Sequence, residues 1–397
     1  MRTCAVLLLS LALFLPYATE ALAQEEPEWL IMVYMNGDRP SSDSCYFSLE
    51  EPGIADINEM ERGIGDGVTV VIEFDRGQCD SSNDGWDTTR RYLITPDRTE
   101  ETGDDMRIDS KLIEDLGEKD MGDPETLVDF TLWACDTFPA NRRMLIIWDH
   151  GSGWIDSYPQ DNEVPIKSVC VDNYDELTMG ELDYAMSEIT SQYDIDILGF
   201  DACLMQMLEV VYELREYVPI IIGSENVEPE TGWTYDSILR AAESDPDPEG
   251  FAQAIVQSYD LFSTSTLSAV RCSDVDGVVE SLNALCSKII EYNVDTSIAL
   301  DSTSYFQHTD ATNKKDYADL YSFAESLLPV GIIAEEAEDL MQAIERCTIS
   351  EAHGSRIVAH GLSIWLPRSY VDSMQSYGEL KISESQWDEF LRHSLNV

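Results

Sequence analysis

Five short apolar runs, separated by longer stretches of helical periodicity, constrain the fold of this 397-residue chain more than any other feature. Each run is continuous instead of alternating with polar residues, and most are rich in β-branched side chains, as in strands buried on both faces. The runs span residues 29–35, 68–74, 144–148, 195–200 and 218–222, with helical patterns between them at 54–64, 124–138, 178–189 and 204–217. The alternation predicts βαβ units and therefore an α/β fold with a mostly parallel central sheet flanked by helices.

The periodicity becomes mainly helical in the second half of the chain. Helical patterns occupy residues 248–261, 275–292, 317–327 and 332–346, and a strand-like run follows at 362–366. The segment 245–250, Asp-Pro-Asp-Pro-Glu-Gly, has the composition of a linker. We therefore expect a larger domain at 24–244 and a mainly helical C-terminal subdomain at 245–397 that contributes a strand near 362–366.

The first 23 residues have the features of a secretory signal peptide. Arg2 provides a positive start, residues 6–15 are apolar, and Ala21-Leu22-Ala23 offers a small-residue cleavage pattern. No later segment is apolar over the roughly 20 residues that a membrane span requires. We expect residues 1–23 to be removed, and the mature protein to be secreted or periplasmic without a membrane partner.

The chain is strongly acidic, with 77 Asp and Glu residues against 24 Lys and Arg residues and a formal net charge of -53. This charge opposes binding to a phosphate backbone, which requires clustered Lys and Arg, so we expect no nucleic-acid partner. A solvated surface accounts for the charge, and cation binding and attraction of basic substrates are two alternatives. The nine cysteines are irregularly spaced and leave a disulfide framework undecided.

Two loops that each follow an apolar run carry residues suited to nucleophilic catalysis. His150 and Gly151 follow the third run, and Cys203 follows the fourth. In an open α/β sheet such residues line a crevice at the carboxyl ends of the strands, so His150 and Cys203 are expected to face each other. An imidazole can hold a cysteine as its reactive thiolate, and a helix beginning near Leu204 would lower the pKa of Cys203 further. The N–H groups of Gly151 and Cys203 are candidates for stabilising an oxyanion.

A structural role is the alternative for both side chains. Cysteine is among the most often buried residue types, and a single histidine is equally ambiguous. Against this, the sequence lacks the His-Glu-x-x-His, phosphate-loop and Gly-x-Ser-x-Gly motifs of other common enzyme classes.

Residues 148–154 (WDHGSGW) and 199–205 (GFDACLM) resemble the His and Cys motifs of the clostripain family of cysteine peptidases, which are relatives of caspases, gingipains and legumain. The similarity covers most of residues 29–240 and is patchy beyond. It implies a caspase-like fold and a catalytic dyad of His150 and Cys203, without a cofactor for the chemistry. Calcium dependence is known in the family and fits the acidity, but the acidic segment 172–176 is only a weak candidate for the ligands, which stay unassigned.

The resemblance also implies that Asp201 lies at the base of a pocket for the basic P1 residue, the one before the scissile bond. A carboxylate there would attract an ammonium group and could bind a guanidinium group through two hydrogen bonds. The alternative is that Asp201 caps the helix after Cys203. Glu225 and Trp233 could line the same cleft, although Glu is common on surfaces and Trp in cores.

The resulting hypothesis is a secreted cysteine endopeptidase that acts on protein or peptide substrates after Arg or Lys. Lys167 is the only Lys or Arg between residues 151 and 200, so the bond Lys167–Ser168 is a predicted self-cleavage site. The alternative for Lys167 is an ordinary surface lysine. A catalytically inactive or binding-only member of the same fold, and another cysteine hydrolase or transpeptidase, are the competing functions.

Overall fold

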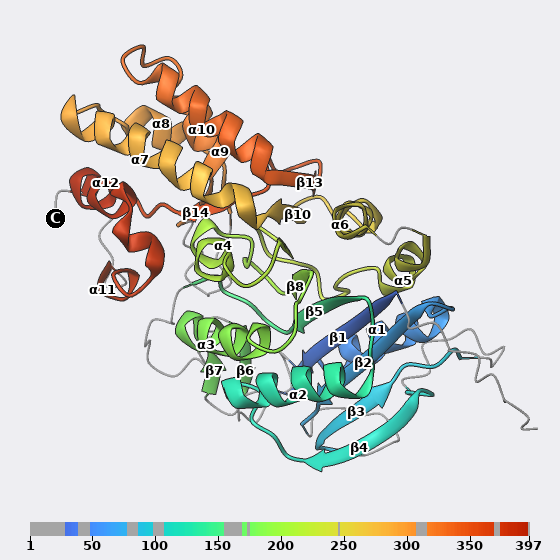
Figure 1. Cartoon of the computed structure of the whole chain (residues 1–397). Coiled ribbons are helices and arrows are strands. Elements are labelled where there is room, and N and C mark those ends of the chain that lie inside the picture. Colours follow the sequence, from blue (N-terminus) through green and yellow to red (C-terminus); the bar gives the residue numbers. More distant parts are fainter. Residues whose placement is uncertain are drawn as a thin grey trace, which may run out of the picture.

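The computed structural model describes residues 28–38, 48–77, 86–97, 107–154, 169–172, 175–244, 247–306, 316–368 and 374–395. The expected signal peptide, residues 1–23, and the expected self-cleavage site, Lys167–Ser168, lie outside the described residues. Figure 1 shows a twisted central sheet with helices on both faces and a further group of helices at the C-terminal end of the chain.

A nine-stranded sheet forms the centre of the described structure, in the order β13-β10-β9-β8-β5-β1-β2-β3-β4. The five apolar runs form the five strands in its middle, and every neighbouring pair among them is parallel. The predicted parallel centre is therefore confirmed. These strands are β1 (Trp29–Asn36), β2 (Val68–Asp75), β5 (Arg142–Trp148), β8 (Ile197–Asp201) and β9 (Ile220–Gly223).

Antiparallel strands extend the sheet at both edges, and the sequence analysis did not anticipate them. They are β3 (Thr89–Leu93) and β4 (Lys111–Gly117) beyond β2, and β10 (Thr266–Arg271) and β13 (Thr348–His353) beyond β9. Every residue of β4 and β13 is at least partly exposed. An edge strand of this kind shows no continuous apolar run, because water covers one of its faces.

The two faces of the sheet carry separate apolar cores, because successive side chains of a strand point to opposite sides. In β1, Leu30 and Met32 belong to one core, whereas Ile31 and Val33 belong to the other. The helices that pack on the first face include α2 (Pro124–Thr137), α3 (Met179–Thr190) and α4 (Leu208–Leu214). The second face is covered by α1 (Glu50–Gly63), α5 (Tyr235–Ser244) and α6 (Pro248–Ser258).

Local capping signals define where the helices on the first face begin. The side chain of Asp123 accepts a hydrogen bond from the Glu125 N–H at 2.9 Å, with Pro124 in the first turn of α2. Thr178 and Glu181 form a reciprocal capping box at the start of α3. These short-range contacts explain why both helices start where the sequence predicts.

The chain after residue 245 contributes more to the central sheet than the sequence suggested. Both β10 and β13 join that sheet, whereas the run expected at 362–366 forms β14 (Ser363–Trp365) in a small separate sheet with β11 (Tyr305–Phe306) and β12 (Tyr317–Asp319). Apolar residues of the C-terminal helices belong to the same core as the first face of the sheet. One apolar core therefore continues across the boundary expected near residue 245.

The C-terminal region is otherwise mainly helical, as expected. Besides α6, its described α-helices are α7 (Val275–Glu291), α8 (Ser297–Ser302), α9 (Leu320–Leu327), α10 (Ala334–Cys347), α11 (Met374–Tyr377) and α12 (Gln386–Leu395), with short 3-10 helices at Cys272–Asp274 and Lys381–Glu384. A short hairpin of β6 (Val169–Asp172) and β7 (Asp175–Leu177) precedes α3.

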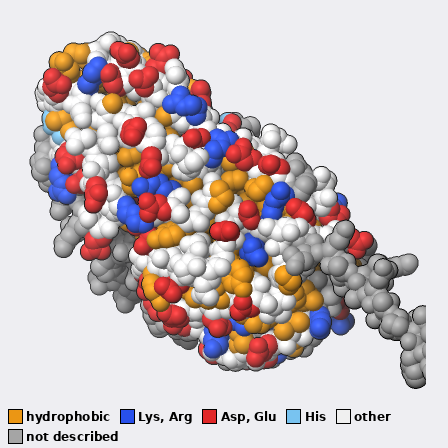
Figure 2. Space-filling model, in the orientation of Figure 1, with side chains coloured by type: hydrophobic (Ala, Val, Ile, Leu, Met, Phe, Trp, Pro, Cys, Tyr) orange, Lys and Arg blue, Asp and Glu red, His pale blue; other side chains and the backbone are white. Residues whose placement is uncertain are grey.

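Acidic side chains are dispersed over the surface. On the face shown in Figure 2, Asp and Glu side chains occur over both ends of the molecule and alternate with Lys and Arg. Among the described helices, none is long and apolar enough to cross a membrane.

Candidate active site

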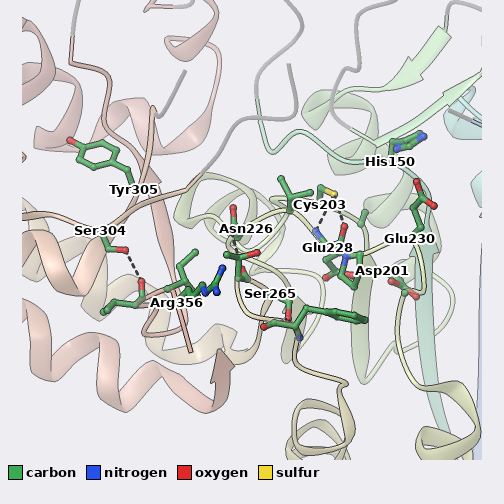
Figure 3. Close-up of a pocket in the computed structure, with 18 of the residues that line it drawn as sticks. His150, Asp201, Cys203, Asn226, Glu228, Glu230, Ser265, Ser304, Tyr305 and Arg356 are labelled. Atoms are coloured by element: carbon green, nitrogen blue, oxygen red, sulfur yellow. Dashed lines mark hydrogen bonds between the residues drawn. The ribbon is translucent and has the colours of Figure 1, made fainter. Parts of the chain in front are cut away.

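The register between β5 and β8 brings the expected nucleophile and base to the same edge of the sheet. Trp148, the last residue of β5, pairs with Asp201, the last residue of β8. His150 and Cys203 each lie two residues beyond this pair, and the Asp149 N–H donates a hydrogen bond to the Asp201 carbonyl at 3.3 Å. Both residues line a cleft of about 1070 Å³, and Figure 3 shows them at the same end of it.

Gly151 packs against the backbone of Cys203 more closely than a side chain would allow. A Cβ atom on Gly151 would lie 2.4 Å from the carbonyl oxygen of Cys203 and 3.1 Å from its backbone nitrogen. The close approach of the two loops therefore requires glycine at this position. Such proximity is also what a joint oxyanion site of the two N–H groups needs.

The loop after Cys203 is not the start of a helix, contrary to our expectation. Helix α4 begins only at Leu208, and Leu204 has a φ angle of 66° in the left-handed region. The N–H of Leu204 instead donates to the Asn226 carbonyl at 3.1 Å. The predicted lowering of the Cys203 pKa by a helix dipole is therefore wrong, and so is the alternative role of Asp201 as a helix cap.

The thiol of Cys203 lies against the backbone of Glu228. The Glu228 N–H donates to Sγ at 3.2 Å, and the thiol points to the Glu228 carbonyl oxygen at 3.9 Å. Burial raises the pKa of Cys203 to about 12, and the negative charges of Glu228 and Asp201 raise it as well. A thiol with such a raised pKa stays protonated at neutral pH, so it can act as a nucleophile only if a base removes its proton.

Asp201 is buried at the inner side of the cleft, where protein donors hold its carboxyl group. The Trp233 N–H donates to Oδ2 at 3.1 Å, and the Tyr235 hydroxyl donates to the same oxygen at 2.8 Å. Burial raises the pKa of Asp201 to about 6, against the lowering effect of these hydrogen bonds. The carboxyl group is therefore mostly ionised at neutral pH and can attract a cation.

Two further carboxyl groups surround Asp201, and we call Asp56, Asp201 and Glu228 the floor cluster. A Cβ atom on Gly232 would lie 2.9 Å from Oδ2 of Asp201 and 3.1 Å from Oδ2 of Asp56. The indole N–H of Trp148 donates to that Asp56 oxygen at 2.8 Å. Burial raises the pKa of Asp56 and of Glu228 well above the usual range, and the charge of Asp201 raises both further. A cation that reached this cluster would relieve the repulsion.

Asp149 holds the strand β6 beside the His150 loop. Its Oδ2 accepts hydrogen bonds from Asn36 Nδ2 at 3.0 Å and from the Val171 N–H at 2.8 Å. The Asn36 amide also donates to the Val171 carbonyl at 3.0 Å, so three chain segments meet at one buried carboxyl group. Burial raises the pKa of Asp149, although the backbone N–H of His150 and these donors oppose the shift.

The C-terminal region anchors the other end of the His150 loop. The ring of Trp154 is packed edge-on against Trp365 and Tyr377, with centroid distances of 5.0 and 4.9 Å. The Tyr317 hydroxyl donates to the Ser152 carbonyl at 2.6 Å. The position of the loop therefore depends on residues that follow it by more than a hundred positions.

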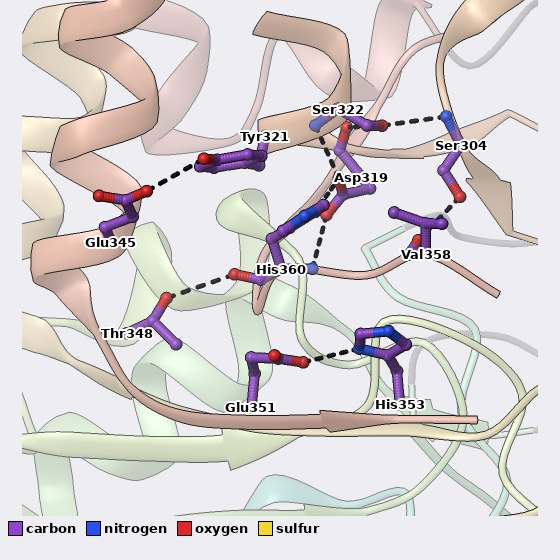
Figure 4. A network of polar contacts seen from close by, with 10 residues as sticks. All are labelled: Ser304, Asp319, Tyr321, Ser322, Glu345, Thr348, Glu351, His353, Val358 and His360. Carbon is purple, nitrogen blue, oxygen red and sulfur yellow. Dashed lines mark hydrogen bonds and ion pairs between the residues drawn. The ribbon is translucent and has the colours of Figure 1, made fainter. Parts of the chain in front are cut away.

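Glu225 and Trp233, which we expected to line the cleft, are instead buried behind its wall. Each side chain is 1% exposed, and neither belongs to the cleft lining. Burial raises the pKa of Glu225, and the charge of Asp319 raises it further. Asp319 in turn accepts a hydrogen bond from the His360 N–H at 2.9 Å and contacts Nδ1 of His360 at 2.8 Å, as Figure 4 shows.

The cysteines of the described ranges are all free thiols. Except for Cys203, which is partly exposed, they are buried: Cys135, Cys170, Cys272, Cys286 and Cys347. Cys203 is therefore the described thiol that a substrate can reach.

A second group of carboxyl groups, which we call the strand-end cluster, has the geometry of a cation site. One oxygen from each of its members, Asp38, Asp75, Glu118 and Asp172, lies within 4.8 Å of those of the other three. Asp75 is fully buried, and its Oδ2 atom has no hydrogen-bond partner among the described residues. An orphaned buried carboxylate oxygen among three other carboxyl groups fits a hard cation such as calcium.

The raised pKa values in the strand-end cluster also favour a cation site, because a bound cation would stabilise the ionised carboxyl groups. Burial raises the pKa of Asp75 to about 9 and that of Asp172 to about 7, and neighbouring acidic groups add to both shifts. Of the acidic segment 172–176 considered above, Asp172 belongs to the cluster and Asp175 and Glu176 do not, while residues 173–174 lie outside the described ranges.

The sequence analysis missed Asp56, Glu228 and Tyr235 as parts of the site. A signal for Glu228 was present, because the loop 224–232 follows the strand β9 as the two motif loops follow β5 and β8. The rule that strand ends line the crevice applies equally to this third loop. No comparable signal marks Asp56, which reaches the floor cluster from helix α1 on the second face of the sheet.

Comparison with known proteins identifies a curated relative of this chain. Clostripain from Hathewaya histolytica is 28% identical to this chain over 226 residues, which cover 53% of the chain and 41% of clostripain. The chain thus matches less than half of the length of that relative.

Two solved structures share the fold over nearly the whole chain. One is a secreted C11 cysteine protease from Bacteroides thetaiotaomicron in complex with an irreversible peptide inhibitor, with a TM-score of 0.66 and 19% identity over 91% of this chain and 99% of the other. The second is an inactive zymogen C11 protease from Parabacteroides distasonis, with a TM-score of 0.66 and 18% identity over 90% of this chain and 98% of the other. At this level of identity, the likeness establishes a shared α/β fold.

The sequence model of the clostripain family matches residues 33–393. This range includes both motif loops, the floor cluster and the C-terminal region that anchors the His150 loop. The chain therefore belongs to the clostripain family of cysteine peptidases.

Proposed function

We propose that this protein is a cysteine endopeptidase that cleaves peptide bonds after Arg or Lys, with Cys203 as nucleophile and His150 as base. The observation that carries the proposal is the pairing of Trp148 with Asp201, which sets the two side chains at equivalent positions beyond adjacent parallel strands. The cleft that they share opens onto the Asp201 carboxyl group.

The chemistry follows from the state of the thiol. Because the pKa of Cys203 is raised to about 12, His150 accepts the thiol proton as Sγ attacks the carbonyl carbon of the scissile bond. The N–H groups of Gly151 and Cys203 stabilise the oxyanion that forms. His150 then donates the proton to the departing amine, and water hydrolyses the thioester to release the second product and restore the thiol.

The floor cluster supports a preference for a basic P1 side chain. An ionised Asp201, beside the carboxyl groups of Asp56 and Glu228, offers a cationic group a buried site that a neutral side chain cannot exploit. Trp233 and Tyr235 keep the Asp201 carboxyl group in place.

The test is hydrolysis of matched reporter peptides with Arg, Lys or norleucine at P1. Cys203→Ala and His150→Ala should each lower kcat by at least about a thousandfold, and the double variant should lose little more, because the pair acts as a unit. His353→Ala, an exposed histidine outside the cleft, serves as the control. Near-normal activity of Cys203→Ala would refute the proposal, and an inactive wild type would favour a binding-only member of the fold.

We also propose export and self-processing. The signal-peptide features of residues 1–23 support secretion, and the two structural relatives above include one described as secreted. Cleavage after Lys167 would leave His150 and Cys203 in different fragments, held together because β5 and β8 are adjacent in one sheet. Intact-mass analysis should show fragments divided after Lys167 in the wild type and a single chain in Cys203→Ala and in Lys167→Gln.

We further propose that the strand-end cluster binds calcium. Bound calcium would compensate the negative charge of the four converging carboxyl groups. It would have no role in the proton transfers of the reaction. Asp172 lies in β6, which Asp149 joins to the His150 loop through the Val171 N–H. Calcium should raise Tm by a few degrees and a chelator should reverse the shift in Cys203→Ala, where self-cleavage does not interfere. An unchanged Tm over millimolar calcium would contradict the proposal.

A further inference from the structure

The wall of the cleft opposite His150 carries a single strong cation. Among the described residues that line the cleft, Arg356 is the only Arg or Lys. Figure 3 places it on the side of Ser265 and Ser304, with its guanidinium group directed into the pocket. The residue is exposed, and it is not among the residues of the described ranges that form an ion pair. A guanidinium group in this position is available to a ligand.

The segment that carries Arg356 is fixed by backbone contacts to the neighbouring loop. The Arg356 N–H donates to the Ser263 carbonyl at 2.8 Å, and the Gly354 N–H donates to the Ser265 carbonyl at 2.9 Å. A Cβ atom on Gly354 would lie 1.9 Å from the carbonyl oxygen of Phe262, so only glycine fits this turn. Arg356 therefore lies in a turn whose backbone is fixed by hydrogen bonds.

The other end of the segment is held equally well. The Ser304 hydroxyl donates to the Val358 carbonyl at 2.8 Å, and Asp319 holds both the backbone N–H and the ring of His360 (Figure 4). The ring of Tyr321 stacks on that histidine at a centroid distance of 4.2 Å. Contacts on both sides of Arg356 thus hold the segment that carries it in place.

The remainder of the cleft has the opposite charge. The carboxyl groups of Asp149, Asp201, Glu228, Glu230 and Glu325 all belong to the lining. In a protein with a net charge of -53, an acidic peptide residue is repelled at nearly every position of such a cleft. Near Arg356, an acidic residue of the peptide is attracted instead of repelled.

We propose that Arg356 forms a second specificity subsite, which takes an acidic side chain of the peptide substrate at a fixed distance from P1. This inference rests on the proposed endopeptidase function and deepens it. A basic residue at the floor cluster and an acidic residue at Arg356 would together set the register of the peptide across Cys203. The guanidinium group can bind a carboxylate through two parallel hydrogen bonds, which adds directional selectivity.

The experiment is a positional scan of a reporter peptide with Arg at P1. Each position from P4 to P2 and from P1′ to P3′ carries Glu or its neutral match Gln in turn, and kcat/KM is measured at low salt. We expect Glu to exceed Gln by about three- to tenfold at one position or two adjacent ones, since the pair is partly exposed. Arg356→Gln should abolish this ratio, and Arg356→Glu should replace it with a preference for Lys at the same position.

The control is Arg392→Gln, which removes an equal charge from α12, far along the chain from the cleft-lining residues. It should keep the wild-type ratio, and high salt should reduce that ratio in the wild type by screening the pair. Equal rates for Glu and Gln at every position, or a ratio that survives Arg356→Gln, would overturn the subsite while leaving the proposed function intact. Failure of the wild type to cleave any peptide of the set would overturn both.

Discussion

The floor cluster and the strand-end cluster are both groups of carboxyl groups near the ends of the central parallel strands, but they differ in how their buried oxygens are satisfied. In the floor cluster, Asp201 accepts hydrogen bonds from a backbone N–H and a tyrosine hydroxyl, and Asp56 accepts one from an indole. In the strand-end cluster, one oxygen of Asp75 contacts Thr89 at 2.5 Å and the other has no partner among the described residues.

The difference indicates two kinds of cation. Protein donors in the floor cluster hold Asp201 in place, and Asp201 borders the cleft, which suits a substrate side chain that binds and dissociates. The strand-end cluster lies outside the cleft lining and leaves a buried oxygen unsatisfied, which suits a resident ion. Four variants or conditions test this distinction.

The largest effect is expected for Asp201→Asn. Loss of the buried negative charge should cost about 2 to 5 kcal/mol in transition-state binding of Arg and Lys substrates, or roughly thirtyfold to several thousandfold in kcat/KM. Hydrolysis after norleucine should change much less. Asp276→Asn, an exposed aspartate on α7, is the matched control. If charged and neutral P1 substrates lose activity in equal proportion, Asp201 does not bind the cationic side chain of the substrate.

A smaller but distinct effect is expected for Asp75→Asn. The amide keeps the shape of the carboxylate but removes one charge from the strand-end cluster, so calcium affinity should fall by about tenfold or more. Isothermal titration of calcium into Cys203→Ala, with and without Asp75→Asn, measures this directly. Asp201→Asn should leave calcium binding unchanged, and a parallel loss in that variant would show that the two clusters are not separate.

The pH dependence of stability without calcium should also distinguish the clusters. Because the folded-state pKa of Asp75 is raised to about 9, from an ordinary value near 4, protonation stabilises the fold at low pH. This contribution is lost as pH rises between these values. In a chelator, Tm should therefore fall between about pH 5 and pH 9, and calcium should restore it at the alkaline end. A Tm that rises over this range in the chelator would show that the buried Asp75 carboxyl group does not control the pH dependence.

The smallest effect is expected for Glu228→Gln. At the alkaline pH where Cys203 ionises, the Glu228 carboxylate raises the pKa of Cys203, so removing its charge should favour the thiolate and shift alkylation of Cys203 to lower pH by about one unit or less. The rate of iodoacetamide labelling against pH measures the shift, with Glu230→Gln on the same loop as the control. A shift to higher pH would mean that Glu228 acts on the thiol by contacts other than charge.

The sequence predicted the middle of the fold and the shared location of His150 and Cys203 because both depend on short-range patterns. Continuous apolar runs specify strands buried on both faces, and capping residues such as Asp123 and Thr178 specify where helices start. Residues placed directly after two such strands must meet if the strands are neighbours. The edge strands were missed for the converse reason, since β4 and β13 are exposed and carry no continuous apolar signal.

The helix after Cys203 shows how tertiary contacts override a local pattern. The apolar periodicity of residues 204–217 favoured a helix from the first of them, yet hydrogen bonds from Leu204 and Gln206 to the loop after β9 hold residues 203–207 in a turn. Those bonds satisfy backbone N–H groups that a helix start would leave without partners. The environment of the Cys203 thiol is consequently set by Glu228 and not by a helix dipole.

What the sequence by itself determined is the set of parallel strands and the two residues that their ends carry, because local hydrophobic patterning and chain order specify both. Only the tertiary structure decided which carboxyl groups join Asp201, which oxygen of Asp75 lacks a partner among the described residues, and which arginine lines the cleft with Cys203. Asp56 and Arg356 reach the site from segments that precede or follow Cys203 by about 150 positions. Electrostatic interaction depends on distance and burial in space, and neither is encoded in the local sequence around these residues.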